Sequence, residues 1–277
     1  MANDYVAKMF DVSGKVAAKT GGGGILCSGM AEALGAAGVK VAVLDLREDA
    51  AEVVAKKIRG QGGQAVAVAV DVLRRDSIED AYKKVVDKLG PVDVLINGAG
   101  GNKREATTSP DLSFFDLPEQ SVRWVFDLNC LGTIMPSQIF CRAMAERGVG
   151  NVINISSMSA FHPLTKVLAY SGAKAAISNF TEWLAIHMAQ NYSPKIRVNA
   201  LAPGFFLTEQ NRFLLTDEKT GAMTPRGKSI INSTPMARYG DPSELLGALF
   251  WLISDASSFV TGTVVAVDGG FNCFCGV

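Results

Sequence analysis

Seven short apolar runs are spaced along the chain and are separated by stretches with helical periodicity. The runs cover residues 16–18, 41–45, 65–71, 92–97, 151–156, 196–202 and 264–268. Each run is apolar along its length rather than alternating, which is typical of parallel strands covered on both faces. The pattern therefore predicts an α/β fold: a doubly wound, seven-stranded parallel sheet with right-handed connections and helices on both faces.

The stretches between the runs predict the helices and two long loops. Helical periodicity covers residues 28–37, 50–59, 78–89, 122–147, 168–190 and 245–253. Residues 102–120 and 205–235 do not fit the alternation, and loops of this length are commonly lids or binding loops. Both follow predicted strand ends, where open α/β sheets bind ligands. We predict one domain over residues 1–277, with a substrate loop at about 102–120 and a lid at about 205–235.

Composition excludes several classes of protein. The chain has 277 residues, 48% of them hydrophobic and 19% charged, so it is not disordered. Lys plus Arg and Asp plus Glu both total 27, which leaves no basic excess for nucleic-acid or membrane-surface binding. The five cysteines lack the paired spacing of a zinc site, and neither a secretory signal nor a membrane-spanning window is present. We expect a cytoplasmic protein with no metal, nucleic-acid or membrane partner.

A glycine-rich turn, residues 21–24, follows the first predicted strand and opens the first helix. Glycines there let the backbone approach a pyrophosphate, whose negative charge the helix N-terminus favours. Asp45 ends the second strand, where a carboxylate can hydrogen-bond an adenosine ribose and repel a 2′-phosphate. Asp71 ends the third strand and Asn97-Gly98-Ala99-Gly100 ends the fourth, at the same sheet edge. These features predict a dinucleotide site that prefers NAD(H) without excluding NADP(H).

Tyr170 and Lys174 lie four residues apart at the start of a predicted helix, so they share one helix face. A nearby cation favours phenolate and lowers the tyrosine pKa from its usual value of about 10. The pair is therefore a candidate general acid or base near neutral pH. Ser157 ends the fifth strand and can donate to a carbonyl oxygen in the same site.

The order of these motifs resembles that of the short-chain dehydrogenase/reductase family over nearly the whole chain. The resemblance implies a Rossmann-type domain and an NAD(P)-dependent enzyme that acts on CH–OH groups. It implies that Tyr170 gives or takes the proton and that Ser157 polarises the substrate oxygen. It also implies that Lys174 lowers the tyrosine pKa and binds the nicotinamide ribose, and that Asn129 holds a water of the proton relay.

The resemblance extends to the cofactor contacts. It implies that Asp71 and Val72 flank the adenine, and that Pro203-Gly204 and Thr208 approach the nicotinamide end. The predicted cofactor-binding residues are Gly21, Gly24, Ile25, Leu26, Asp45, Asp71, Val72, Asn97, Ala99, Tyr170, Lys174, Pro203, Gly204 and Thr208.

The chain departs from the family pattern at two places. The usual motif is TGxxxGxG, but Ile25 and Cys27 stand at its second and third glycine positions. We expect Gly24 to take over by a one-residue slip of the turn. Lys19 stands where a buried strand is normally apolar, and we expect it to snorkel to the surface or to mark a local change.

Basic residues in the two long loops suggest a substrate class. Lys103 and Arg104 follow the fourth strand, and Arg212 lies in the second loop, which also carries Arg226. Cations over the reaction site suit an anionic substrate, and arginine binds carboxylates in bidentate fashion. We therefore predict that Lys103, Arg104 and Arg212 bind a sugar acid.

The Gly100-Gly101-Asn102 segment, the insert up to Asp116 and the C-terminal Asp268–Asn272 resemble one branch of the family, the D-mannonate oxidoreductases or fructuronate reductases. That resemblance implies interconversion of D-mannonate and D-fructuronate. A polyol or gluconate 5-dehydrogenase-like activity remains an alternative, and a non-catalytic dinucleotide-binding sensor is a third. Relatives are commonly tetramers, which implies a homotetramer.

Overall fold

The seven predicted strands form one parallel sheet in the computed structural model, which describes residues 2–207, 215–216 and 221–276. The strands are β1 (Val16–Thr20), β2 (Lys40–Asp45), β3 (Ala65–Ala69), β4 (Val94–Asn97), β5 (Gly150–Ile155), β6 (Ile196–Pro203) and β7 (Val264–Val267). Their order is β3-β2-β1-β4-β5-β6-β7, so the winding reverses between β1 and β4. Ligands of such sheets bind beyond the carboxyl ends of the strands at this reversal.

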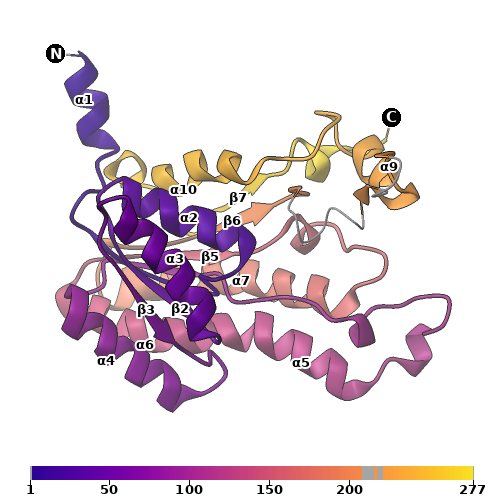
Figure 1. Ribbon diagram of the computed structural model, residues 1–277, viewed down its shortest axis with the longest axis horizontal. Helices are drawn as coiled ribbons and strands as arrows, with labels where there is room; N and C mark the ends of the chain where they lie inside the picture. Colours follow the sequence, from indigo (N-terminus) through magenta and orange to yellow (C-terminus); the bar gives the residue numbers. More distant parts are fainter. Residues whose placement is uncertain (1, 208–214, 217–220, 277) are drawn as a thin grey trace.

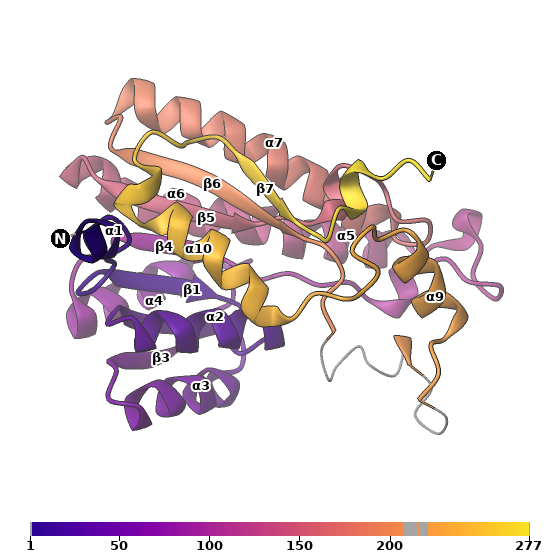
Figure 2. The ribbon, with the colours of Figure 1, turned by 90° about the horizontal axis from the view of Figure 1, so that it is seen from above.

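Helices cover both faces of the sheet (Figures 1 and 2). One face packs against α2 (Ile25–Ala36), α3 (Glu48–Gly60) and α10 (Leu246–Ile253). The other packs against α4 (Arg75–Leu89), α6 (Leu131–Arg147) and α7 (Leu168–Asn191). Figure 1 shows α5 (Glu119–Asn129) and α9 (Pro225–Asn232) toward the end of the molecule where the strands finish, and α1 (Ala2–Met9) projecting at the other end.

Burial on both faces explains why the strands read as continuous apolar runs. Every residue of β1 and β6 is buried. Lys19, in the middle of the sheet, is charged where its neighbours are mostly apolar, yet its side chain is fully buried as theirs are. The expectation that it snorkels is therefore wrong: helices cover the sheet above it and leave no path to water.

The helix predicted over residues 122–147 is two helices. The first ends at Asn129 and the second begins at Leu131, with Cys130 between them at φ −88° and ψ −64°. At the break, the Thr133 hydroxyl donates to the main-chain oxygen of Asn129 at 3.0 Å, and the Asn129 amide donates to the oxygen of Val125 at 2.7 Å. Side-chain hydrogen bonds of this kind compete with the helical ladder. They leave the apolar periodicity unchanged, so the sequence pattern does not reveal the break.

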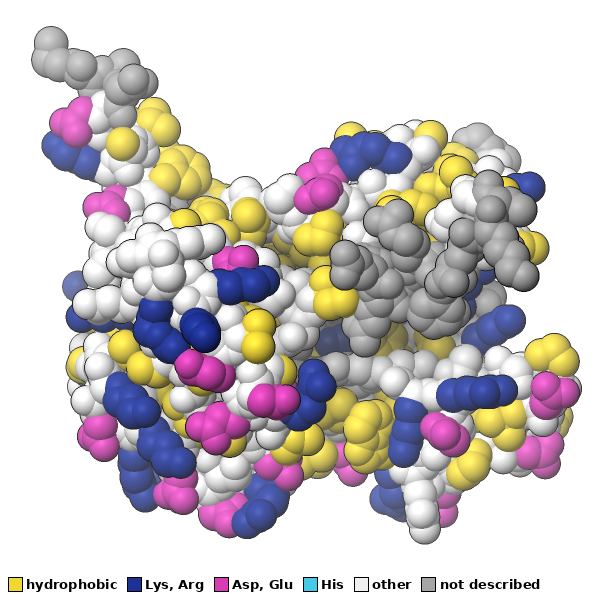
Figure 3. Space-filling view, viewed as in Figure 1, with side chains coloured by type: hydrophobic (Ala, Val, Ile, Leu, Met, Phe, Trp, Pro, Cys, Tyr) yellow, Lys and Arg dark blue, Asp and Glu magenta, His cyan; other side chains and the backbone are white. Residues whose placement is uncertain are grey.

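Helices α1 and α9 were not predicted. A local start signal marks α9, because the Thr224 hydroxyl accepts from Gly227 N at 3.0 Å and Pro225 occupies the first turn. Within the described ranges, no helix has the length and apolarity needed to cross a membrane. On the face seen in Figure 3, basic and acidic side chains are interspersed over α3 and α4, in keeping with the equal numbers of both.

Candidate active site

A cleft of about 640 Å³ lies at the carboxyl ends of the central strands. It gathers predicted site residues from the glycine turn, three strand ends and α7. These are Gly21, Gly24, Ile25, Leu26, Asp45, Ser157, Tyr170, Lys174, Pro203 and Gly204. Segments that are up to 183 residues apart in the chain therefore meet in one site, because all the strands are parallel and end at the same edge.

The glycine turn is shaped to hold a dinucleotide. Gly21 has φ +62°, and a Cβ there would lie 2.7 Å from the Gly98 oxygen, so only glycine fits. Gly24 is the N-cap of α2, and no side chain in the described part of the chain caps that helix. Its first N–H groups are therefore left to an anion such as a pyrophosphate. The residues present fit the cofactor that the sequence predicts.

Asp45 is fixed against this turn at the end of β2. One carboxylate oxygen accepts from Gly23 N at 2.9 Å, and the other accepts from Arg47 N at 3.1 Å. The charge of Asp45 is thereby placed beside the turn, where it can bind ribose hydroxyls and repel a phosphate. The Arg47 side chain also lines the cleft.

Tyr170, Ser157 and Lys174 form the polar centre of the cleft. Tyr170 and Ser157 are hydrogen-bonded to each other, and Ser157 Oγ also accepts from Ser159 N at 3.1 Å. Lys174 Nζ lies 5.6 Å from the centroid of the Tyr170 ring and donates to the main-chain oxygen of Ile155 at 2.7 Å. The Lys174 side chain is thus hydrogen-bonded to the end of β5, and the Tyr170 side chain to the segment that follows β5.

The net shift of the Tyr170 pKa is upward, opposite to the direction expected from the lysine alone. Desolvation raises the pKa of Tyr170, and the hydrogen bond with Ser157 only partly opposes it. Desolvation also lowers the pKa of Lys174 to about 8, while the electrostatic effect of Cys27 opposes that shift. Desolvation is the largest contribution to both pKa shifts because both side chains are buried.

Asn129 is fully buried and ties the loop after β4 to α5. Its amide nitrogen donates to the Gly101 oxygen at 2.6 Å, and its amide oxygen accepts from Gly101 N at 3.2 Å. A Cβ on Gly100 would lie 2.6 Å from that amide oxygen and 3.3 Å from Lys174 Nζ. Asn129 is therefore next to the lysine, and its role in a proton relay stays a prediction.

Four predicted cofactor residues do not line the cleft. The Asn97 amide donates to Ser137 and Asn154 at 2.9 Å in the core, and Ala99 N donates to the Thr20 hydroxyl at 3.2 Å. These bonds hold the end of β4 against β1 and β5. Asp71 and Val72 lie at the end of β3, and their contact with an adenine stays a prediction. Thr208 lies outside the described residues.

A second cavity, of about 680 Å³, adjoins the cleft, and Phe205 lines both. Its described charged or titratable lining residues include His162 and Lys166, from the segment between Ser157 and Tyr170, and Arg226 from α9. On α9, Arg226, Ser229, Ile230 and Ser233 face the cavity with the spacing of one helix face. Arg226 was expected among the cations of the 205–235 lid, whereas Ser229, Ile230 and Ser233 were not predicted, because α9 was read as a loop.

The basic residues predicted to bind substrate are placed differently. The ammonium of Lys103 lies 4.7 Å from the centroid of the Trp124 ring, a cation–π contact. Neither Lys103 nor Arg104 lines the cleft or the adjoining cavity. Arg212 lies outside the described residues. A substrate contact of these three residues stays a prediction.

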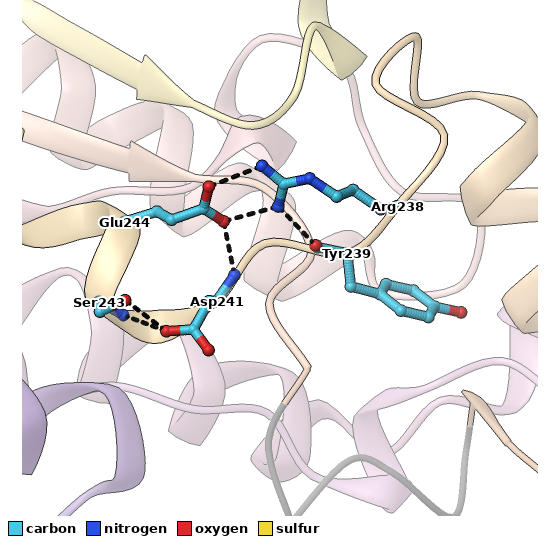
Figure 4. A network of polar contacts seen from close by, with 5 residues as sticks. All are labelled: Arg238, Tyr239, Asp241, Ser243 and Glu244. Carbon is cyan, nitrogen blue, oxygen red and sulfur yellow. Dashed lines mark hydrogen bonds and ion pairs between the residues drawn. The ribbon is translucent and has the colours of Figure 1, made fainter.

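A polar network fixes the segment that returns from α9 to α10 (Figure 4). The Arg238 guanidinium donates to both oxygens of Glu244, at 2.7 and 2.6 Å, and Glu244 also accepts from Asp241 N at 2.8 Å. Asp241 in turn accepts from Ser243, which completes a capping box. The hydrogen bond with Arg238 lowers the pKa of Glu244 to about 2, so the network stays charged across ordinary pH.

Comparisons with known proteins show the family to which the chain belongs. A family model described as enoyl-(acyl carrier protein) reductase matches residues 24–272. The uncharacterised oxidoreductase UxuB of Bacillus subtilis (strain 168) is 47% identical over 276 residues, covering 96% of this chain and 98% of the relative. The 5-keto-D-gluconate 5-reductase of Escherichia coli (strain K12) is 34% identical and covers 95% of this chain and 97% of its own.

A solved structure resembles the whole fold. The structure of a proposed D-mannonate oxidoreductase from Haemophilus influenzae, with bound NAD, superposes with a TM-score of 0.91 at 45% identity. The match covers 98% of this chain and 100% of the other. Together with the cleft that unites the glycine turn, Ser157, Tyr170 and Lys174, these matches show that the chain is an oxidoreductase of the short-chain dehydrogenase/reductase family.

Proposed function

We propose that this enzyme interconverts a hydroxyl and a keto group on a sugar acid, with D-mannonate and D-fructuronate as the pair and NAD(H) as the preferred cofactor. The observation that carries the proposal is the cavity beside the cleft. Its described charged or titratable lining residues, apart from Cys275, are His162, Lys166 and Arg226, and none is acidic. A carboxylate is the complementary ligand for such a surface. The name of the Haemophilus influenzae structure and its bound NAD support the same reading.

The residues of the cleft supply the proton chemistry. A bound nicotinamide supplies or accepts the hydride. In reduction, the Tyr170 phenol gives its proton to the substrate oxygen, and in oxidation it takes that proton back. The Ser157 hydroxyl hydrogen-bonds the same oxygen and orients it. Because Lys166 and Arg226 lie in the adjoining cavity, they hold the acid group at a distance from the reacting carbon.

The test compares acidic and neutral substrates. We expect wild-type enzyme to reduce fructuronate with NADH far better than fructose, a neutral ketose. Lys166→Met and Arg226→Met should each lower kcat/KM for fructuronate by about 10–150-fold, as expected for a charge-assisted hydrogen bond of about 1.5–3 kcal/mol. Lys228→Met, on the same helix but away from the cavity, is the matched control. A preference for neutral ketoses would replace this proposal with a polyol dehydrogenase.

A gluconate 5-dehydrogenase-like activity is the second candidate. The Escherichia coli relative at 34% identity, named as a 5-keto-D-gluconate 5-reductase, favours it. The basic cavity suits either acid, so the two candidates differ only in which keto-acid has the higher kcat/KM. Assaying 5-keto-gluconate beside fructuronate, with NADH and NADPH, separates them.

We also propose that the chain forms a homotetramer. On α7, Trp183 and Ile186 are 55% and 59% exposed, and Trp183 stacks with His187 at 4.8 Å between ring centroids. Aromatic side chains exposed on a helix face are typical of protein interfaces. Analytical ultracentrifugation should show a tetramer for the wild type and a smaller species for Trp183→Asp. A monomeric wild type would contradict the assembly.

A further inference from the structure

The two departures from the family motif, Lys19 and Cys27, meet in space. A Cβ placed on Gly98 would lie 2.6 Å from Cys27 Sγ and 3.1 Å from Lys19 Nζ. Gly98 therefore leaves the space in which the sulfur and the amine approach each other. Residues from β1, the segment after β4 and the start of α2 therefore border one small space.

Lys19 brings an uncompensated amine to this point. Its side chain is fully buried, and its Nζ has no hydrogen-bond partner in the described part of the chain. A buried charge without a partner is strongly unfavourable, so it gains from any anion within reach. Cys27 Sγ is the ionisable group that the geometry of Gly98 places beside it.

Cys27 is placed where a thiol reacts. It is the third residue of α2, it lines the dinucleotide cleft, and it is 8% exposed, so a small reagent can reach it. A thiol reacts as its thiolate, and both a helix N-terminus and a neighbouring cation favour that anion. Its SH group makes only a long contact, 3.8 Å to the Gly98 oxygen.

We propose that Cys27 is an oxidative modification site in the dinucleotide cleft, with Lys19 as the counter-ion of its reacting sulfur. With hydrogen peroxide, the thiolate sulfur attacks one peroxide oxygen and the O–O bond breaks. The departing hydroxide takes a proton from solvent, so the peroxide is reduced to water and the sulfur is oxidised to a sulfenic acid. Because Cys27 lines the same cleft as Gly21 and Gly24, we expect the added oxygen to interfere with binding of the pyrophosphate there. A bound dinucleotide covers Cys27 and protects it.

Peptide-resolved mass spectrometry after iodoacetamide treatment tests the contact directly. In the wild type, Cys27 should be labelled at least as fast as the exposed Cys273, which serves as the reference in the same sample. Saturating NAD⁺ should slow labelling of Cys27 at least about tenfold and leave Cys273 unchanged. Lys19→Met should slow labelling of Cys27 about tenfold. Labelling of Cys27 that is much slower than that of Cys273, or insensitive to NAD⁺, overturns the proposal.

The functional consequence is tested by NAD⁺ binding after peroxide treatment. The wild type and Cys273→Ser should lose binding and regain it with dithiothreitol, whereas Cys27→Ala should bind equally before and after peroxide. Loss of binding in Cys27→Ala overturns the site. If Lys19→Met does not fold, anionic iodoacetate replaces it as the probe. Labelling of Cys27 by both iodoacetate and iodoacetamide is then compared between the wild type and Lys19→Gln, in which Lys174 is unchanged; a lower ratio of iodoacetate to iodoacetamide labelling in the variant is expected, and an unchanged ratio overturns the role of Lys19. These outcomes are independent of the sugar-acid substrate.

Discussion

Tyr170 is the residue on which turnover depends most. Its hydroxyl is hydrogen-bonded to Ser157, and desolvation keeps its pKa above the ordinary value, so it holds a proton to donate. Tyr170→Phe keeps the ring and removes the proton carrier. We expect turnover to fall by about 10²–10⁴-fold while NAD⁺ still binds. Steady-state kinetics and NAD⁺ titration measure the two effects. A variant that retains more than about half of its activity contradicts the assignment.

Lys19 is expected to lower the stability of the fold while it favours reaction of the neighbouring Cys27 sulfur. Its Nζ is buried and makes no hydrogen bond in the described part of the chain, so an apolar side chain of similar length removes a desolvation cost that the Cys27 sulfur only partly offsets. We expect Lys19→Met to raise the free energy of unfolding by about 1–3 kcal/mol. Denaturant unfolding measures it, and Lys56→Met on the exposed face of α3 is the control, expected to change stability by less than about 0.5 kcal/mol. A destabilised Lys19→Met would mean that pairing with the Cys27 sulfur outweighs the cost of burying the amine.

Single residues show how far the site could be predicted from the sequence. The four-residue spacing of Tyr170 and Lys174 and the place of Asp45 at a strand end were visible in the sequence, and the structure brings the three into one cleft. That Lys19 and Cys27 approach each other was not predictable, because the contact passes through Gly98 on a third segment. The direction of the Tyr170 pKa also depends on burial, which no spacing reveals.

At the scale of elements, we expect the junction of β1, α2 and β2 to determine which cofactor is preferred. Asp45→Asn keeps an acceptor for Gly23 N and removes the charge that faces a 2′-phosphate. We expect the ratio of kcat/KM for NADPH to that for NADH to rise at least about tenfold, a change of about 1.4 kcal/mol. Arg47→Ala should lower the same ratio, because that cation lines the cleft. Equal kcat/KM for the two cofactors in the wild type would contradict a preference for NAD(H).

The strands were predictable as elements and the helix boundaries only in part. Strands buried on both faces have short runs that are apolar at every position, a pattern distinct from that of amphipathic helices and loops, and all seven predicted runs form strands. The break after Asn129 and the helix α9 depend on side-chain hydrogen bonds at single positions. The missed helix had a consequence for function, since Arg226 and its cavity were assigned to a loop.

At the scale of the whole molecule, parallel topology assembles the site from distant segments. The predicted sheet was sufficient to place the glycine turn, Asp45, Ser157 and Tyr170 at one edge. It was not sufficient to choose the cations that face the substrate, because loop paths beyond the strand ends follow no simple period. The cytoplasmic location and the tetramer stay predictions for a different reason, because the fold of one chain reveals neither.

The pH dependence of turnover belongs to this scale, because burial of the assembled site determines it. Desolvation lowers the pKa of Lys174 from 10.5 to about 8 and raises that of Tyr170, so rising pH removes the ammonium before the phenol proton. The charge of Lys174 is complete below about pH 7 and largely lost by about pH 9. Loss of that charge makes proton donation by Tyr170 harder. We therefore expect kcat/KM for keto-acid reduction to be constant below about pH 7 and to fall with a midpoint near 8.

Lys174→Arg is the matched variant for this profile, because a guanidinium stays charged across the whole range. Its turnover should be lower than that of the wild type, since the longer fork does not fit the contact with the Ile155 oxygen at 2.7 Å. The shape of its profile is the discriminating readout: the fall near pH 8 should disappear. A wild-type profile that is flat from about pH 7 to 9, or an arginine variant with the same midpoint, would assign the titration to another group. The lysine would then hold the cofactor and the tyrosine in place without setting the protonation of the site.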